Sequence, residues 1–262
     1  MCILHAVGRN GTSNRDDIRT VQILLNFNLA EMPDFHPLSE DGSVGPATID
    51  AIETFQKRVM GMNEPDGVVD PNGSTLRALR DGIALGFTER HLRGIMIHAT
   101  DGNVARYCPG LKQNMAANGI DKPLRQAHFL AQVAHESGEL RYCEEIASGA
   151  AYEGRVDLGN TQPGDGVRFK GRGLIQLTGR ANYTKYGKAR NRDFTTDEKP
   201  KLIATDPSLA VDVACWFWTQ HGLNTLADKD DVVAITRVIN GGLNGLADRQ
   251  AKLARARFFL VR

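Results

Sequence analysis

The stretch from Ala127 to Tyr183 constrains the fold most, because it joins a helical pattern, two groups of acids and a Gly-rich loop. Its first part predicts a helix. Pro123 suits a first helical turn, where its missing N–H has no partner to lose, and apolar residues recur at helical spacing over 129–134. Gly138 weakens the helix, so Glu136 is expected near its C-terminal end.

A carboxyl group at the C-terminal end of a helix is expected to have a raised pKa. The negative end of the helix dipole and an adjoining apolar face both disfavour the charged form of Glu136. A carboxylic acid that stays protonated near neutral pH is what a glycosidase uses to protonate a leaving oxygen. The alternative, a solvated glutamate at a helix end, is the commoner situation for a single residue of this kind.

A second acidic group follows at Glu144 and Glu145. Nine residues are two and a half helical turns, so Glu136 and Glu145 would lie on opposite faces of one straight helix. A bend at Ser137–Gly138 would allow both to face one groove. An inverting glycosidase needs its two carboxyl groups roughly 6.5–9.5 Å apart, with water between them. Sequence spacing alone does not fix that distance.

The segments AHFLAQVAHESGE, GRGLIQLTGRANY, WFW and RVINGGLNGLADR together resemble glycoside hydrolase family 19. They are most similar to its lysozyme-like branch, found in phage endolysins and bacterial cell-wall hydrolases. The matching segments extend from about Tyr107 to Arg249. The resemblance implies a lysozyme-like helical domain that hydrolyses a β-1,4-linked glycan by an inverting acid/base mechanism.

The resemblance also implies residue roles. Glu136 matches the general acid and Glu145 the base that activates water, with Glu144 and Glu153 as competitors for the base. The hydroxyl of Thr178 matches one that helps to hold the water. Matching substrate-binding positions are Gln176, Asn182, Asn240, Arg249, His135 and Tyr183. The alternatives are a turn or capping role for Gln176 and Asn182, a surface charge for Arg249, and orientation of Glu136 for His135.

The N-terminal part contains an internal half-repeat. DGSVGPATIDAIETFQKRV, from Asp41, and DGVVDPNGSTLRAL, from Asp66, each run from Asp-Gly through Pro to a short helix with Thr near its start. A helix over 14–29 precedes them. Residues 12–80 thus resemble the small three-helix peptidoglycan-binding module with a DGxxGPxTxxAxxxFQ signature. The implied role is anchoring to the wall, and the alternative is a helical spacer domain.

These patterns predict a mainly α protein. Residues 1–82 would form the wall-binding domain (core about 12–80), 83–89 a linker, and 90–262 the catalytic domain, with at most a small β element. The strand is expected in GRGLIQLT. The turn-rich loop over 152–171 is long enough for a functional role, and we expect it to line the groove.

Composition excludes several other classes. The net charge of +1 over 262 residues gives no global basic field for nucleic acid or a membrane surface. The four cysteines form no CxxC pair, so neither zinc nor a disulfide framework is expected. An HExxH metal motif would need histidine in place of Glu139. His128 and His135, seven apart, are predicted to be packed or hydrogen-bonded. We expect no metal or organic cofactor.

The start, MCILHAVGRNG, lacks the features of a signal peptide, and no stretch approaches the ~20 apolar residues of a membrane span. We therefore expect synthesis in the cytoplasm, no stable membrane insertion, a monomer, and action on peptidoglycan in the periplasm. Release through a holin fits, and so does delivery as an effector with an immunity protein. Three functions stay open: a muramidase, a chitinase and a non-catalytic wall-binding protein.

Overall fold

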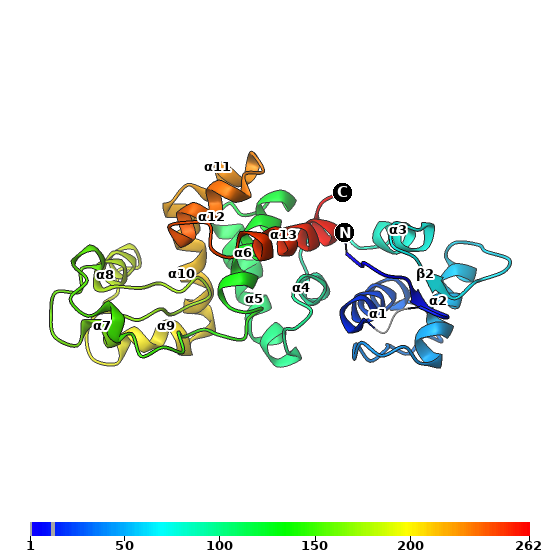
Figure 1. Ribbon diagram of the computed structural model, residues 1–262, viewed down its shortest axis with the longest axis horizontal. Helices are drawn as coiled ribbons and strands as arrows, with labels where there is room; N and C mark the ends of the chain where they lie inside the picture. Colours follow the sequence, from blue (N-terminus) through cyan, green and yellow to red (C-terminus); the bar gives the residue numbers. More distant parts are fainter. Residues whose placement is uncertain (1, 12–13) are drawn as a thin grey trace. The chain divides into compact units, whose positions relative to one another are not determined.

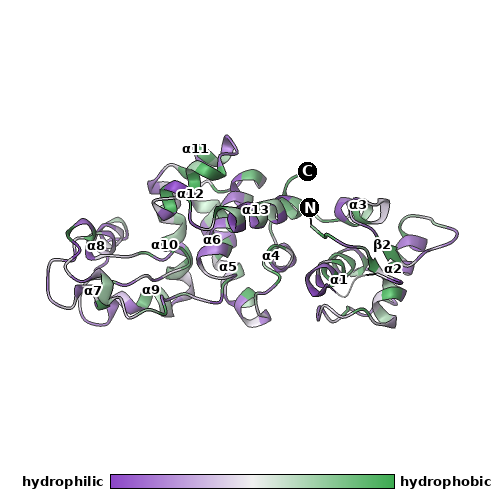
Figure 2. Cartoon of the chain, in the orientation of Figure 1, coloured by the Kyte–Doolittle hydropathy of each residue, from purple (hydrophilic) through white to green (hydrophobic). Residues whose placement is uncertain are grey.

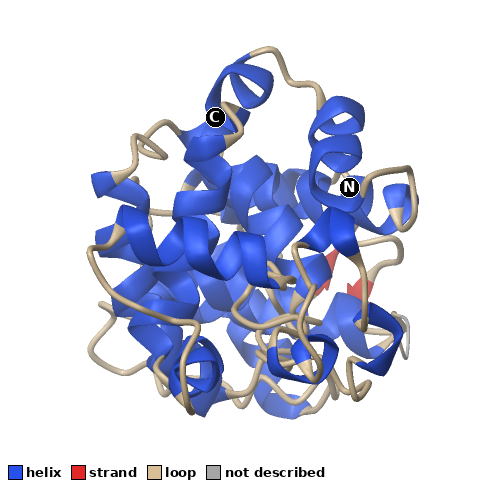
Figure 3. Ribbon diagram, turned by 90° about the vertical axis from the view of Figure 1, so that its left-hand side faces the viewer, coloured by secondary structure: helices blue, strands red, loops and turns tan. Residues whose placement is uncertain are grey.

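The structure is a computed structural model that describes residues 2–11 and 14–262. As predicted, the described part of the chain is mainly α-helical. Figure 3 shows helices throughout and strands in one small region. The chain packs into two compact units, one extending to Ile97 and including Ala254–Arg262, the other His98–Leu253. The predicted domain limits at 82 and 90 remain a sequence interpretation, and the predicted core start at residue 12 lies outside the described residues.

The first unit contains four helices and a two-stranded sheet among its described residues. They are α1 (Arg15–Leu29), α2 (Pro46–Arg58), α3 (Ser74–Asp81), α4 (Glu89–Ile95), β1 (Val7–Gly8) and β2 (Val68–Val69), coloured blue to green in Figure 1. The strands are antiparallel, with Val7 opposite Val69. Leu24, Ile52 and Phe55 are completely buried between the helices. The predicted helix over 14–29 is confirmed as α1, and Asn14 caps it by accepting hydrogen bonds from two backbone N–H groups.

The two Asp-Gly turns of the half-repeat are each bound by one buried glutamine, Gln22 or Gln56. The amide of Gln22 donates to the carboxylate of Asp41 (3.1 Å) and accepts from the backbone N–H of Gly42 (2.9 Å). The amide of Gln56 likewise donates to Asp66 (2.6 Å) and accepts from Gly67 (3.0 Å). Each glutamine therefore holds one Asp-Gly turn, and both are almost fully buried. Since buried polar groups need partners, these bonds fix both turns.

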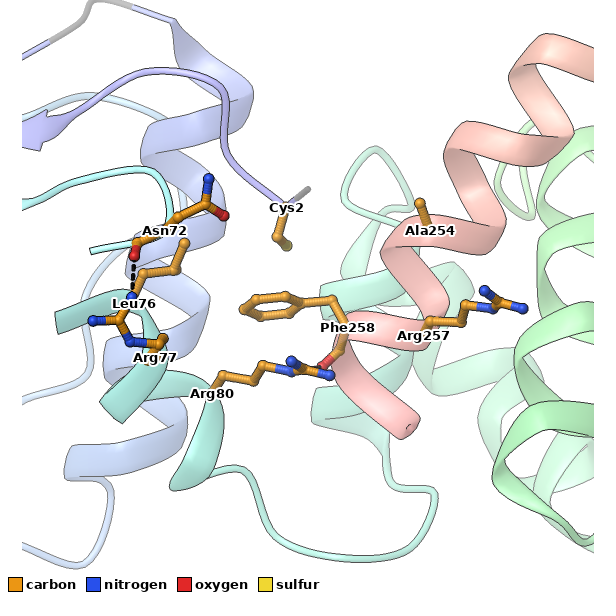
Figure 4. A pocket seen from close by; sticks show the side chains of 8 residues that line it. All are labelled: Cys2, Asn72, Leu76, Arg77, Arg80, Ala254, Arg257 and Phe258. Atoms are coloured by element: carbon orange, nitrogen blue, oxygen red, sulfur yellow. Dashed lines mark hydrogen bonds between the residues drawn. The ribbon is translucent and has the colours of Figure 1, made fainter. Parts of the chain in front are cut away.

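The chain's last residues pack into this first unit. Arg80 donates hydrogen bonds to the backbone carbonyls of Phe258 (3.3 Å) and Val261 (2.8 Å). Both Arg80 and Phe258 line a cavity of about 280 Å³. Figure 4 shows the side chain of Arg80 extending toward Phe258, whose ring is directed into the cavity. Arg77 donates to the carbonyl of Asn72. Arg77 and Arg80 therefore donate hydrogen bonds to backbone carbonyls, and we interpret their role at this cavity as structural.

The second unit is built around two buried helices, α6 (Pro123–Glu136) and α10 (Pro207–Gln220). Residues 127–134 of α6 are all buried, and Figure 2 shows hydrophobic colour along α10. Phe129 of α6 meets Trp218 of α10 edge to face, at 5.4 Å between ring centres. The other helices are α5 (Asp101–Ala117), α7 (Asp165–Arg168), α8 (Arg180–Ala189), α9 (Leu202–Thr205), α11 (Leu223–Asp228), α12 (Val232–Asn240) and α13 (Leu246–Leu260), which runs on into the first unit.

The strand predicted in GRGLIQLT is wrong. Arg172 makes isolated bridges to Glu144 and Leu177, but residues 173–176 form a turn in which Gln176 has a positive φ of 59°. The described strands lie in the first unit instead. Leu174, Ile175 and Leu177 are buried although the segment turns. A short apolar run reflects burial, and burial alone does not distinguish a strand from a packed turn.

Candidate active site

Glu136 is the last residue of α6, as predicted, and the chain turns sharply after it. Gly138, Glu139 and Leu140 all have left-handed backbone, with φ of 56°, 58° and 67°. Such conformations cost about 1–2 kcal/mol for residues with a Cβ. The bend needed near Ser137–Gly138 is therefore present, and it must be held by other interactions.

Glu139 supplies that support. Its buried carboxylate accepts hydrogen bonds from Lys252 (2.8 Å) and from the backbone N–H of His98 (2.8 Å). Burial raises the pKa of Glu139, but the hydrogen bond and charge of Lys252, with the hydrogen bonds from His98, outweigh it and hold the pKa below its usual value. Glu139 therefore remains charged and pins the turn that follows Glu136.

The carboxylate of Glu136 is paired with the guanidinium of Arg249, from α13. Arg249 also donates a hydrogen bond to the side-chain oxygen of Gln132, one helical turn before Glu136. The Arg249 side chain is only 1% exposed, whereas 17% of the Glu136 side chain is exposed. The prediction that Arg249 contacts substrate is therefore wrong, because its guanidinium is enclosed. It holds the carboxylate of Glu136 instead.

His135, the neighbour of Glu136, is fixed by α13 and the loop before it. Its Nδ1 lies 2.6 Å from a carboxylate oxygen of Asp248. A Cβ added to Gly245 would lie 2.3 Å from Cε1 of the His135 ring, so the loop backbone packs directly against the imidazole. Only glycine permits that approach, and it also tolerates the positive φ of 72°. About a quarter of the His135 side chain stays exposed.

Glu145 lies in the segment after the turn, paired with the chain near Gly171. Its backbone N–H donates to the carbonyl of Gly171 (2.9 Å), and its carboxylate accepts from the N–H of Gly171 (3.2 Å). The other carboxylate oxygen accepts from the hydroxyl of Tyr152 (3.0 Å). Burial, followed by the hydrogen bond to Glu145, raises the pKa of Tyr152. The phenol thus stays protonated and remains a donor to Glu145.

The two competitor glutamates have other partners. Glu144 forms an ion pair with Arg172 (2.8 Å), whose side chain is 3% exposed, and lies 3.5 Å from Lys170. Glu153 accepts hydrogen bonds from the backbone N–H groups of Gly164 (2.7 Å) and Gly166 (2.8 Å). Each carboxylate thus stabilises a local structure, Glu144 by balancing a buried charge and Glu153 by closing a loop.

Gln176, Thr178 and Asn182 lie on the turn and helix start next to this segment. A Cβ on Gly171 would lie 2.7 Å from the side-chain oxygen of Gln176 and 3.4 Å from a carboxylate oxygen of Glu145, so both side chains border one glycine. Thr178 donates to the carbonyl of Gln176 (2.9 Å), and Asn182 donates to that of Thr178 (2.8 Å). All three side chains are partly exposed. The local hydrogen bonds match the turn and capping alternative, and they leave the hydroxyl oxygen of Thr178 able to accept.

Tyr183 does not bind substrate as predicted, because it is completely buried. Its hydroxyl donates to the carbonyl of Lys170 (2.8 Å) and accepts from Arg172 (3.1 Å). Asn240, by contrast, is exposed where α12 ends at Gly241. His128 pairs with Asp230 (2.8 Å). In the part of the chain that the structure describes, no group of three or more His, Cys, Asp or Glu is arranged to hold a metal ion.

Several residues that support the site were not predicted, namely Gln132, Glu139, Lys252, Tyr152 and Asp248. Gln132 stands four residues before Glu136, so helical spacing placed it on the same face as the acid. Lys252 stands three residues after Arg249, so helical spacing likewise places these two residues on the same face of their helix. Glu139 carried no comparable signal, because its partners are distant in the sequence.

Comparisons with known proteins agree with the mainly helical fold and with the two modules expected from the sequence. Residues 125–235 match the glycosyl hydrolase 19 family model, described as chitinase class I, and residues 14–79 match a model described as putative peptidoglycan binding domain. A glycosyl hydrolase family 19 domain-containing protein of Haemophilus influenzae is 34% identical over 169 residues, covering 53% of this chain and 80% of the relative. The fold and site thus define a glycoside hydrolase with a wall-binding module, and the chain belongs to glycoside hydrolase family 19.

Other similar proteins are chitinases. An endochitinase of Arabidopsis thaliana is 39% identical over 116 residues, covering 44% of this chain and 39% of the relative. This chain therefore spans well under half of that protein. Chitinase C from Streptomyces griseus HUT6037 has the same fold, with a TM-score of 0.54 at 24% identity over 66% of this chain and 91% of that chain.

Proposed function

We propose that the protein is a peptidoglycan hydrolase of the lysozyme type, an N-acetylmuramidase that cleaves the β-1,4 glycan backbone with inversion. The observation that carries the proposal is the presence in one chain of a family 19 domain and a peptidoglycan-binding module. The module would hold the chain on its polymeric substrate and raise the local concentration of bonds to be cut.

Glu136 is the proposed general acid. It protonates the glycosidic oxygen as the bond breaks, and it becomes a carboxylate in doing so. The enclosed guanidinium of Arg249, already paired with Glu136, stabilises that carboxylate. Gln132 and Asp248 orient the supporting groups, Arg249 and His135, respectively. Arg249 thus positions the acid and favours its charged product.

Glu145 is the proposed base. It takes a proton from a water molecule that attacks the opposite face of the sugar, and Thr178 holds that water by accepting its second hydrogen. Glu145 is favoured over Glu144 because Glu144 balances the buried Arg172. It is favoured over Glu153 because both oxygens of Glu153 accept backbone N–H groups that close a loop, whereas one oxygen of Glu145 accepts from the hydroxyl of Tyr152 and the other borders the same glycine as Gln176. Gln176 and Asn182 would contact the sugar beside this base.

A chitinase is the second candidate, and it is favoured by the named activity of the endochitinase relatives. Assaying the purified chain on peptidoglycan and on soluble N-acetylglucosamine oligomers separates the two. A new N-acetylmuramic acid reducing end, released as the inverted anomer, is the expected product. Turnover of the oligomers without wall hydrolysis would make the protein a chitinase. Turnover of neither, with wall binding retained, would make it a non-catalytic binding protein.

We further propose that the protein acts on peptidoglycan in the periplasm as a monomer, after release through a holin or delivery as an effector. None of the described helices is long and apolar enough to span a bilayer. Producing the chain in a bacterial host with and without a holin tests the first route, since lysis should depend on the holin. Capture of a neutralising immunity protein by the purified chain would favour the second route.

A further inference from the structure

The loop from Gly149 to Gly166 is closed on itself by backbone contacts. A Cβ added to Gly149 would lie 2.5 Å from the carbonyl oxygen of Gly166, and one added to Gly166 would lie 2.6 Å from the backbone nitrogen of Glu153. Two backbone stretches can approach this closely because glycine has no Cβ. The loop begins with the short 3₁₀ helix η1 (Ala150–Tyr152), so the packing of the whole loop sets the position of Tyr152.

Asn160, which is completely buried, ties this loop to α8. Its side-chain nitrogen donates a hydrogen bond to the backbone carbonyl of Tyr152 (2.9 Å), and its side-chain oxygen accepts one from the backbone N–H of Arg180 (2.8 Å), the first residue of α8. The guanidinium of Arg180 also donates to the buried carboxylate of Asp165 (2.8 Å). Because buried polar groups need partners, these bonds hold the Tyr152 backbone at a fixed place relative to α8.

The side chain of Tyr152 connects this fixed loop to the proposed base. Its hydroxyl donates a hydrogen bond to one carboxylate oxygen of Glu145 (3.0 Å). The second oxygen accepts a longer hydrogen bond from the N–H of Gly171 (3.2 Å) and, like the first, has two lone pairs. Lys170 donates to the backbone carbonyl of Glu145 (2.9 Å). Both the main chain and the carboxylate of Glu145 are therefore held.

We propose that Tyr152 is the positioning residue of the base, and that Asn160 acts through Tyr152. The inference rests on the proposed function, in which an O–H bond of water breaks as the water oxygen bonds to the anomeric carbon. The proton goes to the second oxygen of Glu145, and Glu136 gives its own proton to the leaving oxygen. The phenol exchanges no proton; it fixes the plane of the carboxylate, and a misplaced catalytic group can cost about 10²-fold in rate.

The kinetic test compares native chain, Tyr152→Phe, which keeps the ring, and the control Thr196→Val. The control removes a hydroxyl that donates to the carboxylate of Asp193 (2.8 Å) in an exposed part of the same unit. We expect Tyr152→Phe to lower kcat about tenfold, as for the loss of one hydrogen bond to a charged group, with KM unchanged. Thr196→Val should keep the native kcat.

The substrates are soluble glycan strands and an N-acetylglucosamine hexamer, and the fall should appear on whichever is cleaved, because the base serves either bond. A fall on the hexamer alone would retain the role of Tyr152 while the muramidase proposal fails. A higher KM with native kcat would show that the phenol contacts sugar instead, and native values of both would show that Glu145 needs no phenol. Either result overturns the inference.

Asn160→Ala tests the link from α8 to the phenol. It should also lower kcat, measured on the folded fraction, and the double variant with Tyr152→Phe should be no slower than Tyr152→Phe alone. Residues that act through one contact give such non-additive effects, whereas independent sites give additive ones. Multiplied losses in the double variant would overturn the role of Asn160.

A titration without substrate separates this inference from the proposed function. Burial, followed by the hydrogen bond and charge of Glu145, raises the pKa of Tyr152, and the charge of Arg155 opposes them. In chain with isotope-labelled tyrosine, the NMR signal lost in Tyr152→Phe identifies Tyr152. Glu145→Gln should lower the pKa of Tyr152, and Thr196→Val should leave it unchanged. A lowered pKa in a chain that cleaves neither substrate would retain the contact while the catalytic proposal fails, and an unmoved pKa would overturn the inference.

Discussion

At the scale of single residues, the partner of each glutamate suggests its role. Glu136 is held by an enclosed arginine, Glu145 accepts from a phenol and a backbone N–H, and Glu144 balances a buried arginine. The sequence supplied three neighbouring acids with no means of ranking Glu144 against Glu145. Substitution can now separate catalysis from stability at each position.

Glu136→Gln should lose nearly all lysis while still binding wall. The amide keeps the shape of the side chain but cannot donate a proton with the strength of an acid, and general acid catalysis contributes about 10²–10⁴-fold. Turbidity loss of wall suspensions measures the activity, and co-sedimentation measures the binding. Substantial remaining turnover would remove Glu136 as the acid.

Glu145→Gln and Glu144→Gln should differ in kind. Glu145→Gln should lower kcat by about 10²-fold or more, as expected for a base, with little change in the thermal midpoint. Glu144→Gln leaves the buried Arg172 without a charged partner and should cost about 1.5–3 kcal/mol of stability. Thermal denaturation alongside kinetics distinguishes them. A reversed pattern would make Glu144 the base.

Arg249→Met should reduce both stability and kcat. Removing one member of an enclosed pair typically costs about 3–5 kcal/mol, and a misplaced acid can cost about 10²-fold in rate. Because a folding defect alone would also lower activity, kcat is measured on the folded fraction well below the melting temperature. Arg249→Lys, which keeps the charge, should restore part of the rate. Full activity in folded Arg249→Met would show that Glu136 needs no arginine.

At the scale of elements, the turn after α6 decides where Glu136 points. Helical spacing predicted α6 and its end correctly, because those depend on residues three and four apart. The left-handed backbone at 138–140 could not be predicted in the same way. Glu139 and Leu140 disfavour it, and it persists because Glu139 is bound by His98 and Lys252, which are distant in the chain.

Because Glu139 holds this turn, the stability of the second unit should decrease as the pH falls into the acidic range. The pKa of Glu139 is lowered in the folded protein, so its contribution is complete above the unfolded value of about 4.3 and is lost as pH falls through the folded value. Lys252→Met should cost about 1–3 kcal/mol at pH 7 and flatten the decline of stability below pH 4.3. Urea titrations between pH 3 and 7 measure this. An unchanged acid slope would contradict the assignment.

At the scale of the whole molecule, the two units divide binding from chemistry in the proposed function. The half-repeat of the first unit depends on buried glutamines that hold successive Asp-Gly turns. All proposed catalytic residues belong to the second unit. A defect confined to one unit should therefore affect one property.

Gln56→Leu should destabilise the first unit by about 1–3 kcal/mol, since it leaves the buried N–H of Gly67 without its acceptor. We expect weaker sedimentation with wall and slower lysis of intact wall. The kcat on a soluble glycan fragment should stay unchanged. Exposed Glu64→Gln, outside these hydrogen bonds, is the matched control. A fall in kcat on the soluble fragment would show that the first unit also serves the chemistry.

The sequence by itself determined the helices, the paired Asp-Gly turns and the family, because these depend on periodicity and on motifs that interact over short separations. Only the tertiary structure decided what each acid touches. Glu136 meets an arginine 113 positions away, and Glu145 meets a backbone N–H 26 positions away. The same packing buried Tyr183 and turned the expected strand. Long-range partners are chosen by how helices pack, and no local pattern in the chain encodes that choice.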